Sequence, residues 1–239
     1  MAINLEKGQR INLEKSNGAK LTNFCVGCNW GAIEVMTRKE VVVNEGFLGI
    51  GRRTEWRNVK TELDVDIDLS CVMVDANGEL VDTLYSPLYK PELFRQNGLP
   101  VGKEVSADGA LKSSGDDTEG DKGGDDGLDN EIISVDLTRV SSRTEQIFFF
   151  LNIYSPKDID FPKIPSAATR MYEGTPERVN SVFAKYDVAK EQHFSGKRAL
   201  IMGKLYRRNG EWKFAAIGDA FEDSSLVITV KRILRDYAK

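Results

Sequence analysis

Histidine and cysteine are scarce in this chain of 239 residues, which contains one histidine, His193, and three cysteines. Cys25 and Cys28 have the spacing of a zinc or redox pair, but no second such pair follows, so a four-ligand zinc site of the usual kind cannot be assembled. Residues 24–30 read as a strand, in which positions three apart point to opposite faces. We therefore interpret the cysteines as structural, with a redox-active pair as the alternative.

Long apolar runs are also absent. The longest, IFFFL at residues 147–151, is far shorter than the ~18 residues that span a bilayer. The N-terminal sequence MAINLEKGQRINLEKSNG alternates apolar and polar residues and lacks the apolar centre of a secretory signal. We therefore expect a cytoplasmic protein without an integral membrane segment.

Patterns typical of nucleotide and nucleic-acid binding are missing as well. The basic residues cluster only as scattered pairs, without the interleaved aromatic residues of a single-strand groove. Gly46, Gly49 and Gly51 do not fit the dinucleotide fingerprint, and no phosphate-binding loop is present. We expect no nucleic-acid partner.

Negative charge is concentrated in one stretch. The formal net charge is −4, yet residues 115–131 alone contain eight carboxylates and one lysine, so the rest of the chain is net positive. Five glycines in this stretch allow tight bends that bring several oxygens to one point, which suits calcium with its roughly six to eight oxygen ligands. The spacing excludes an EF-hand, because a loop closed by Glu131 would begin at Gly120, where a carboxylate is required. The candidate ligands here are Asp116, Asp117, Asp125, Asp126, Asp129 and Glu131.

A second set of carboxylates lies upstream, in ELDVDIDLS at residues 62–70. Strand alternation places Asp64, Asp66 and Asp68 on one face, with neighbours about 7 Å apart. Like charges at this distance repel unless a counter-ion is bound. We therefore expect Asp66 and Asp68 to complete a cation site with the acidic stretch, whereas a merely solvated acidic loop is the alternative.

A period of two dominates the rest of the sequence and predicts a mainly β protein: a β-sandwich of two antiparallel sheets with a few short helices. Short strands around Ile3 and Ile11 are expected to form an opening hairpin across a turn at residues 7–9. Further strands are expected at residues 22–30, 65–74, 132–137, 146–154, 169–172, 181–188, 199–207 and 212–218.

The C-terminal region changes to helical spacing. From Ser225 onward the apolar residues predict an amphipathic helix packed on a sheet, with Asp223 and Ser224 available as caps; a helix lying on a membrane surface is the alternative. We expect a single domain over residues 1–239, with insertions at about 31–62 and 86–112. The insertions read as loops or a hairpin extension.

Several motifs together resemble the TerD family of bacterial tellurium-resistance and stress-response proteins. INLEKGQRINLEK resembles the family's KGxxxxL start, FCVGCNW resembles its vGLGW element, and DIDLS matches its DLDAS. The acidic stretch resembles GDNxTGxGxGDDE, and LIMGKLYRRNGEWKFAAIG at residues 200–218 is close to GELYRxxGxWKFxAxG. The resemblance covers most of the chain.

The resemblance implies a β-sandwich that binds calcium and belongs to a multi-protein stress system. Transferred residue by residue, Asp66 and Asp68 take the DLD positions, residues 115–117 the GDN positions, and residues 129–131 the DDE positions. Because the acidic stretch is four residues longer than the family pattern, Asp125 and Asp126 are alternative occupants of the DD positions in place of Asp129 and Asn130.

We therefore expect a calcium-binding, non-enzymatic stress-response protein that acts through other proteins of the tellurium-resistance and stress system. Ion binding would order the acidic stretch by neutralising carboxylates that otherwise repel one another. The competing hypotheses are a metal-dependent hydrolase that uses the clustered aspartates and an interaction scaffold whose acidic loop is only solvated.

Overall fold

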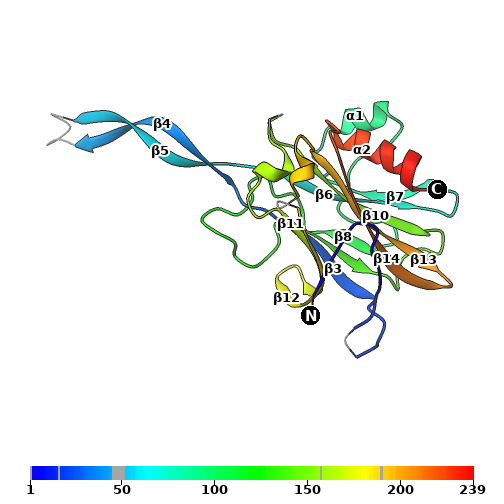
Figure 1. The fold of residues 1–239 in the computed structure, drawn as a ribbon. Helices are drawn as coiled ribbons and strands as arrows, with labels where there is room; N and C mark the ends of the chain where they lie inside the picture. Colours follow the sequence, from blue (N-terminus) through cyan, green and yellow to red (C-terminus); the bar gives the residue numbers. More distant parts are fainter. Residues whose placement is uncertain (1, 16, 45–51, 157, 189–190) are drawn as a thin grey trace.

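The computed structural model describes residues 2–15, 17–44, 52–156, 158–188 and 191–239. Within these residues two six-stranded sheets pack face to face (Figure 1). Sheet I contains, in spatial order, β1 (Ile3–Asn4), β12 (Arg178–Asp187), β11 (Ala168–Thr175), β3 (Asn23–Asn29), β9 (Glu131–Asp136) and β8 (Leu111–Ser113). Sheet II contains β2 (Arg10–Asn12), β14 (Glu211–Phe221), β13 (Ala199–Arg208), β10 (Gln146–Ile153), β6 (Ile67–Val74) and β7 (Leu80–Leu84). The predicted β-sandwich is confirmed.

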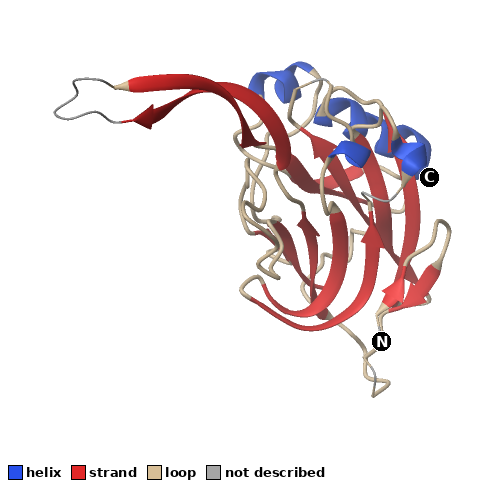
Figure 2. Ribbon diagram, turned by 60° about the vertical axis from the view of Figure 1, so that its left-hand side comes forward, coloured by secondary structure: helices blue, strands red, loops and turns tan. Residues whose placement is uncertain are grey.

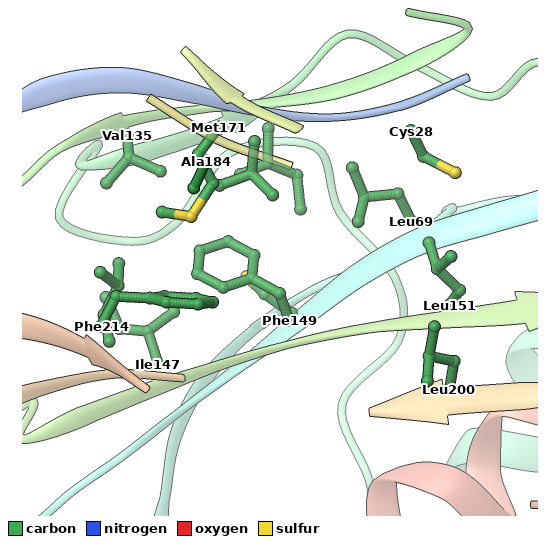
Figure 3. Packing of buried hydrophobic residues seen from close by; sticks show 14 of the residues in the cluster. Cys28, Leu69, Val135, Ile147, Phe149, Leu151, Met171, Ala184, Leu200 and Phe214 are labelled. Atoms are coloured by element: carbon green, nitrogen blue, oxygen red, sulfur yellow. The ribbon is translucent and has the colours of Figure 1, made fainter. Parts of the chain in front are cut away.

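The core lies between the two sheets and is filled by alternate residues of their strands (Figure 3). In β10, Ile147, Phe149 and Leu151 point into this core, whereas Phe148 and Phe150 point to the outer side of sheet II. Both sides of β10 are covered, which explains why its sequence is almost continuously apolar.

The opening hairpin is a wrong prediction. β1 pairs in parallel with β12 in sheet I, whereas β2 pairs with β14 in sheet II, so the turn at residues 7–9 crosses from one sheet to the other. Alternating apolar residues identify short strands, but they do not identify the partner of each strand. Here each strand completes the edge of a different sheet.

The C-terminal helix forms as predicted. α2 (Leu226–Arg232) continues into a π-helix, η3 (Ile233–Tyr237), and its apolar side packs on the outer face of sheet II (Figure 2). The predicted side-chain cap does not form. Asp223 instead makes a bidentate ion pair with Arg232, at 2.6 and 2.9 Å, and the N-cap residue Ser225 makes no side-chain capping hydrogen bond. No helix in the described part of the chain has the length and apolarity needed to cross a membrane.

The two insertions take different forms. Residues 31–62 contain a long hairpin of β4 (Ile33–Asn44) and β5 (Arg53–Leu63), which extends away from the sandwich (Figures 1 and 2). Its glycine-rich connection, residues 45–51, lies outside the described residues. The insertion at 86–112 contains the short helix α1 (Pro91–Gln96) and packs beside α2 through Phe94. Two 3-10 turns, η1 (Phe161–Lys163) and η2 (Gln192–Phe194), complete the described elements.

Candidate metal centre

Three of the predicted ligands converge at one end of the sandwich. Carboxylate oxygens of Asp66, Asp68 and Asp116 all lie within 4.8 Å of one another, and we call these residues the strand group. Asp66 immediately precedes β6, Asp68 lies in β6, and Asp116 comes from the acidic loop, residues 114–130. Segments about fifty residues apart in the sequence thus contribute oxygens to one point.

The strand group is partly buried and short of hydrogen-bond donors, because Asp68 is buried, Asp66 is half-buried and Asp116 is exposed. Asp68 is only 4% exposed, and both Asp66 Oδ1 and Asp68 Oδ2 are buried without a hydrogen-bond partner in the described protein. Burial, followed by the charges of Asp116 and Asp117, raises the pKa of Asp66 to about 7. Burial and the neighbouring carboxylates also raise the pKa of Asp68 well above its ordinary value. Unpaired buried carboxylates are costly unless a cation compensates them, so this geometry fits a metal ion.

Backbone and hydroxyl contacts hold the strand group in place. The Asp66 carbonyl oxygen accepts a hydrogen bond from the Tyr154 N–H at 2.8 Å, and the Asp66 N–H donates to Ser155 Oγ at 2.9 Å. On the loop side, Ser86 Oγ donates to Asp116 Oδ2 at 3.1 Å. Asp68 and Asp116 line a small hollow together with Lys103, but the Lys103 ammonium group pairs with Asp82. Within the described residues, none of the three carboxylates therefore forms an ion pair with a lysine or arginine.

Glu131 connects the acidic loop to sheet II. Its Oε2 accepts from the Leu69 N–H at 2.6 Å, and its Oε1 accepts from the Asp117 N–H at 3.2 Å. The side chain is 3% exposed, and burial together with the charge of Asp68 raises its pKa well above the ordinary value. Because both oxygens already accept backbone hydrogen bonds, Glu131 positions Asp116 beside β6 in addition to adding charge to the site.

A second group, which we call the loop group, comprises Asp121, Asp125 and Asp126, again with carboxylate oxygens within 4.8 Å of one another. This group is more exposed than the strand group. The Asn29 amide donates to Asp121 Oδ2 at 3.1 Å and to Asp125 Oδ1 at 3.5 Å, so part of the charge is compensated by the protein.

The remaining predicted ligands lie outside both groups. Asp129 is buried and pairs with Arg170, whose Nε lies 2.9 Å from Oδ1 and 3.0 Å from Oδ2. Gly27 makes room for this carboxylate, because a Cβ at Gly27 would lie 1.9 Å from Asp129 Oδ2. Asp117 Oδ1 accepts from the Glu119 and Gly120 N–H groups within the loop. The eight predicted residues therefore do not meet at one point. Five belong to the strand group or the loop group, and Asp117, Asp129 and Glu131 form hydrogen bonds or ion pairs outside both groups.

Two further residues were not predicted as ligands. Asp121 lies in the acidic stretch and belongs to the loop group. Asn152 in β10 stands directly opposite Asp68 in the sheet register, and its Oδ1 is buried without a hydrogen-bond partner. Side chains opposite each other on antiparallel strands share a face, so Asn152 offers a neutral oxygen beside the strand group. Only the strand register could have identified it.

The cysteines lie as the strand interpretation predicts. Cys28 is buried in the core between the sheets, whereas Cys25 packs on the outer face of sheet I with Ile132 and Tyr172. All three cysteines are free and buried, and burial raises the pKa of each thiol. Neither Cys25 nor Cys28 has the exposed, low-pKa character of a redox cysteine.

Comparison with known proteins places the chain in a family. The family model for the TerD domain matches residues 1–232. Stress response protein SCP2 of Bacillus subtilis (strain 168) is 30% identical over 238 residues, covering 97% of this chain and 99% of that protein. General stress protein 16U of the same organism is also 30% identical, over 99% of this chain and 97% of its own length.

More distant matches are also TerD proteins by name. Tellurium resistance protein TerD of Serratia marcescens is 26% identical over 92% of either chain. A solved homologue of telluride resistance protein (TerD), SCO6318 from Streptomyces coelicolor A3(2), superimposes with a TM-score of 0.57 over 91% of this chain and 98% of its own, at 14% identity, and so shares the fold. The chain belongs to the TerD family.

Proposed function

We propose that this protein is a calcium-binding, non-enzymatic stress-response protein that acts by binding other proteins. The observation that carries the proposal is the strand group, where Asp66 and Asp68 each leave one buried carboxylate oxygen without a hydrogen bond and a third carboxylate approaches from the acidic loop. The names of the relatives, which describe stress-response and tellurium-resistance proteins, support the biological role.

Calcium suits the site better than magnesium or zinc. The donors are carboxylate oxygens, with an amide oxygen of Asn152 nearby, and the group contains no histidine or thiol. Magnesium requires near-octahedral geometry and retains waters, whereas calcium tolerates irregular oxygen sets. Asp66, Asp68 and Asp116 would hold the ion, and the loop group offers a second, more exposed position.

Binding would act on the acidic loop. An ion shared by Asp116 and the two strand carboxylates would compensate their mutual repulsion and tie the loop to β6, reinforcing the link that Glu131 already makes. The surface of the loop would then be fixed in one arrangement for a protein partner. The cytoplasmic location remains a prediction.

Thermal unfolding of the metal-stripped protein with and without calcium tests the proposal. We expect calcium to raise the melting temperature, and we expect Asp66→Asn/Asp68→Asn to remove the part of that rise that comes from the strand group. Asp125→Asn/Asp126→Asn should leave the contribution of the strand group intact. Glu119→Gln, an exposed change in the same loop, is the matched control. If calcium leaves the wild-type melting temperature unchanged, the acidic loop is only solvated and the proposal is wrong.

The hydrolase hypothesis has its own discriminating result. A metal-dependent hydrolase would turn over phosphoesters in the presence of magnesium or manganese, and Asp66→Ala would abolish that turnover. We expect no turnover above the uncatalysed rate.

A further inference from the structure

A chain of polar contacts runs from the outer face of sheet II into the C-terminal helix that covers it (Figure 2). Asn152 in β10 donates through Nδ2 to Thr229 Oγ1 in α2 at 2.9 Å, and the Thr229 hydroxyl donates to Asp223 Oδ2 at 3.4 Å. Asp223 ends the chain in its bidentate ion pair with Arg232. Asn152, Thr229 and Asp223 are all buried. Buried polar groups are costly unless each is satisfied, so an unsatisfied atom in such a chain needs an explanation.

The directions of these hydrogen bonds fix the orientation of the Asn152 amide. A carboxylate paired with an arginine only accepts hydrogen bonds, so the single hydroxyl proton of Thr229 is committed to Asp223. Thr229 Oγ1 can then only accept from Asn152, which requires the amide NH2 group, and not the carbonyl oxygen, to face α2. The carbonyl oxygen Oδ1 is therefore turned away from Thr229, and it is buried without a hydrogen-bond partner in the part of the chain that the structure describes.

The strand register places this oxygen beside the strand group. Asn152 is paired with Asp68 across β10 and β6, and both side chains lie on the outer face of sheet II, because the residues that flank each of them point into the core between the sheets. Directly opposite residues on antiparallel strands have Cβ atoms about 4.5 to 5.5 Å apart. Asp68 Oδ2 is also buried without a hydrogen-bond donor. Two acceptors cannot satisfy each other, whereas a cation satisfies both.

A second set of contacts ties the start of α2 to the acidic-loop member of the strand group. The N–H of Leu226, the first residue of α2, donates to the Tyr89 hydroxyl at 3.2 Å. The Tyr89 N–H in turn donates to the Ser86 carbonyl oxygen at 3.2 Å, and the Ser86 hydroxyl donates to the Asp116 carboxylate. The helix is thus connected to the strand group from two directions, through β10 and through this turn.

We propose that Asn152 Oδ1 is a fourth protein ligand of the ion at the strand group and that Thr229 is the positioning residue that holds it, so that ion binding and the docking of α2 stabilise each other. The inference rests on the proposed function, because it adds a ligand and its support to the same site. An amide oxygen is an ordinary calcium ligand, and it adds no charge to three carboxylates that already repel one another. Groups that orient a metal ligand by hydrogen bonds typically account for about 10- to 100-fold in metal affinity.

Isothermal titration of the metal-stripped full chain with calcium tests the proposal. All proteins carry Asp125→Asn/Asp126→Asn, so that the loop group does not contribute, and the protein with these two changes alone is the parent. Thr229→Val keeps the shape of the side chain but removes the hydroxyl that orients the amide, so we expect calcium to bind about 10- to 100-fold more weakly. Thr229→Ser keeps the hydroxyl and should bind calcium as the parent does. Asn152→Leu, which removes the oxygen at similar volume, should weaken binding at least as much as Thr229→Val.

Hydrogen exchange of the α2 backbone amides gives a second readout. If the docked helix raises calcium affinity, bound calcium must stabilise the docked helix by the same factor, so calcium should slow exchange in α2 of the parent. Thr229→Val should lose this protection. Val230→Ala shortens a buried apolar side chain of the same helix outside the polar chain, and it is the matched control. It should lower the melting temperature but keep both the calcium affinity and the calcium-dependent protection.

The outcomes separate this inference from the proposed function. If the parent binds calcium and both Thr229→Val and Asn152→Leu bind it with the same affinity, the strand group holds the ion without Asn152; the inference is then wrong and the proposed function stands. If the parent binds no calcium, both are wrong. A loss of affinity in Val230→Ala equal to that in Thr229→Val would also overturn the inference, because general destabilisation of α2 would then explain both losses.

Discussion

Replacing Asp68 by asparagine should stabilise the metal-free protein and remove most of the stabilisation that calcium provides. The wild-type side chain is 4% exposed, has an unpaired Oδ2, and lies beside Asp66 and Asp116. Asparagine keeps the shape but removes the charge. Removing an uncompensated buried group of this kind should stabilise the metal-free protein by about 1 to 3 kcal/mol at neutral pH. For a chain of this size that corresponds to a rise of roughly 2 to 10 °C in melting temperature.

Calcium should offset this difference. At about a hundred times its dissociation constant, calcium stabilises a protein with one site by ~2.7 kcal/mol, which is roughly 5 to 10 °C here. Asp68→Asn should lose most of this increment because it removes a charged ligand. Thermal unfolding of both proteins, with chelator and with calcium, provides the four values. Ser70→Ala, a neutral change on the same strand face, is the control and should retain the calcium increment.

The reasoning requires both that Asp68→Asn is more stable than the wild type without metal and that it gains less stability from calcium. An Asp68→Asn protein that is less stable without metal and gains as much from calcium as the wild type would refute it. Asp68 would then be a structural residue, and the buried carboxylates would need another explanation.

Three further predictions follow from the same contacts. Burial and like charges raise the pKa of Asp66 to about 7, so between pH 4 and pH 7 the metal-free native state holds a proton that the unfolded chain has lost. The stabilisation from this proton is present at pH 4 and falls as the pH rises toward 7, and calcium affinity, measured by titration, should rise over the upper part of this range. Glu131→Gln removes one of two acceptors for backbone N–H groups, so denaturant unfolding should show a loss of about 1 to 3 kcal/mol and calcium should bind more weakly. Arg170→Met leaves the buried Asp129 carboxylate unpaired, so it should destabilise the protein by about 3 kcal/mol or more while leaving the calcium increment unchanged.

The sequence was most informative where periodicity and burial act on the same residues. Alternation within residues 62–70 correctly placed Asp66 and Asp68 together, and the helical spacing after Ser225 predicted α2 and the face that it buries. Such patterns are local, because they follow from the pitch of one strand or helix.

Properties that depend on pairing between distant segments were not predictable in the same way. The partners of β1 and β2 are set by the edges that the two sheets leave open, and the position of Asn152 opposite Asp68 is set by the register of β6 and β10. The division of the acidic loop into two groups depends on contacts with its carboxylates. Asn29 in β3 and Asn130 at the end of the loop donate hydrogen bonds to Asp121, and Arg170 in β11 donates to Asp129. Composition identified the chemistry of the loop but not its folded path.

Calcium binding to the strand group is the central claim, and isothermal titration of the metal-stripped protein tests it most directly. The account predicts binding tighter than millimolar in the wild type and the loss of the strand-group site in Asp66→Asn/Asp68→Asn, while Asp125→Asn/Asp126→Asn retains it. Absence of binding in the wild type, or the same binding in the protein without Asp66 and Asp68, would contradict the account.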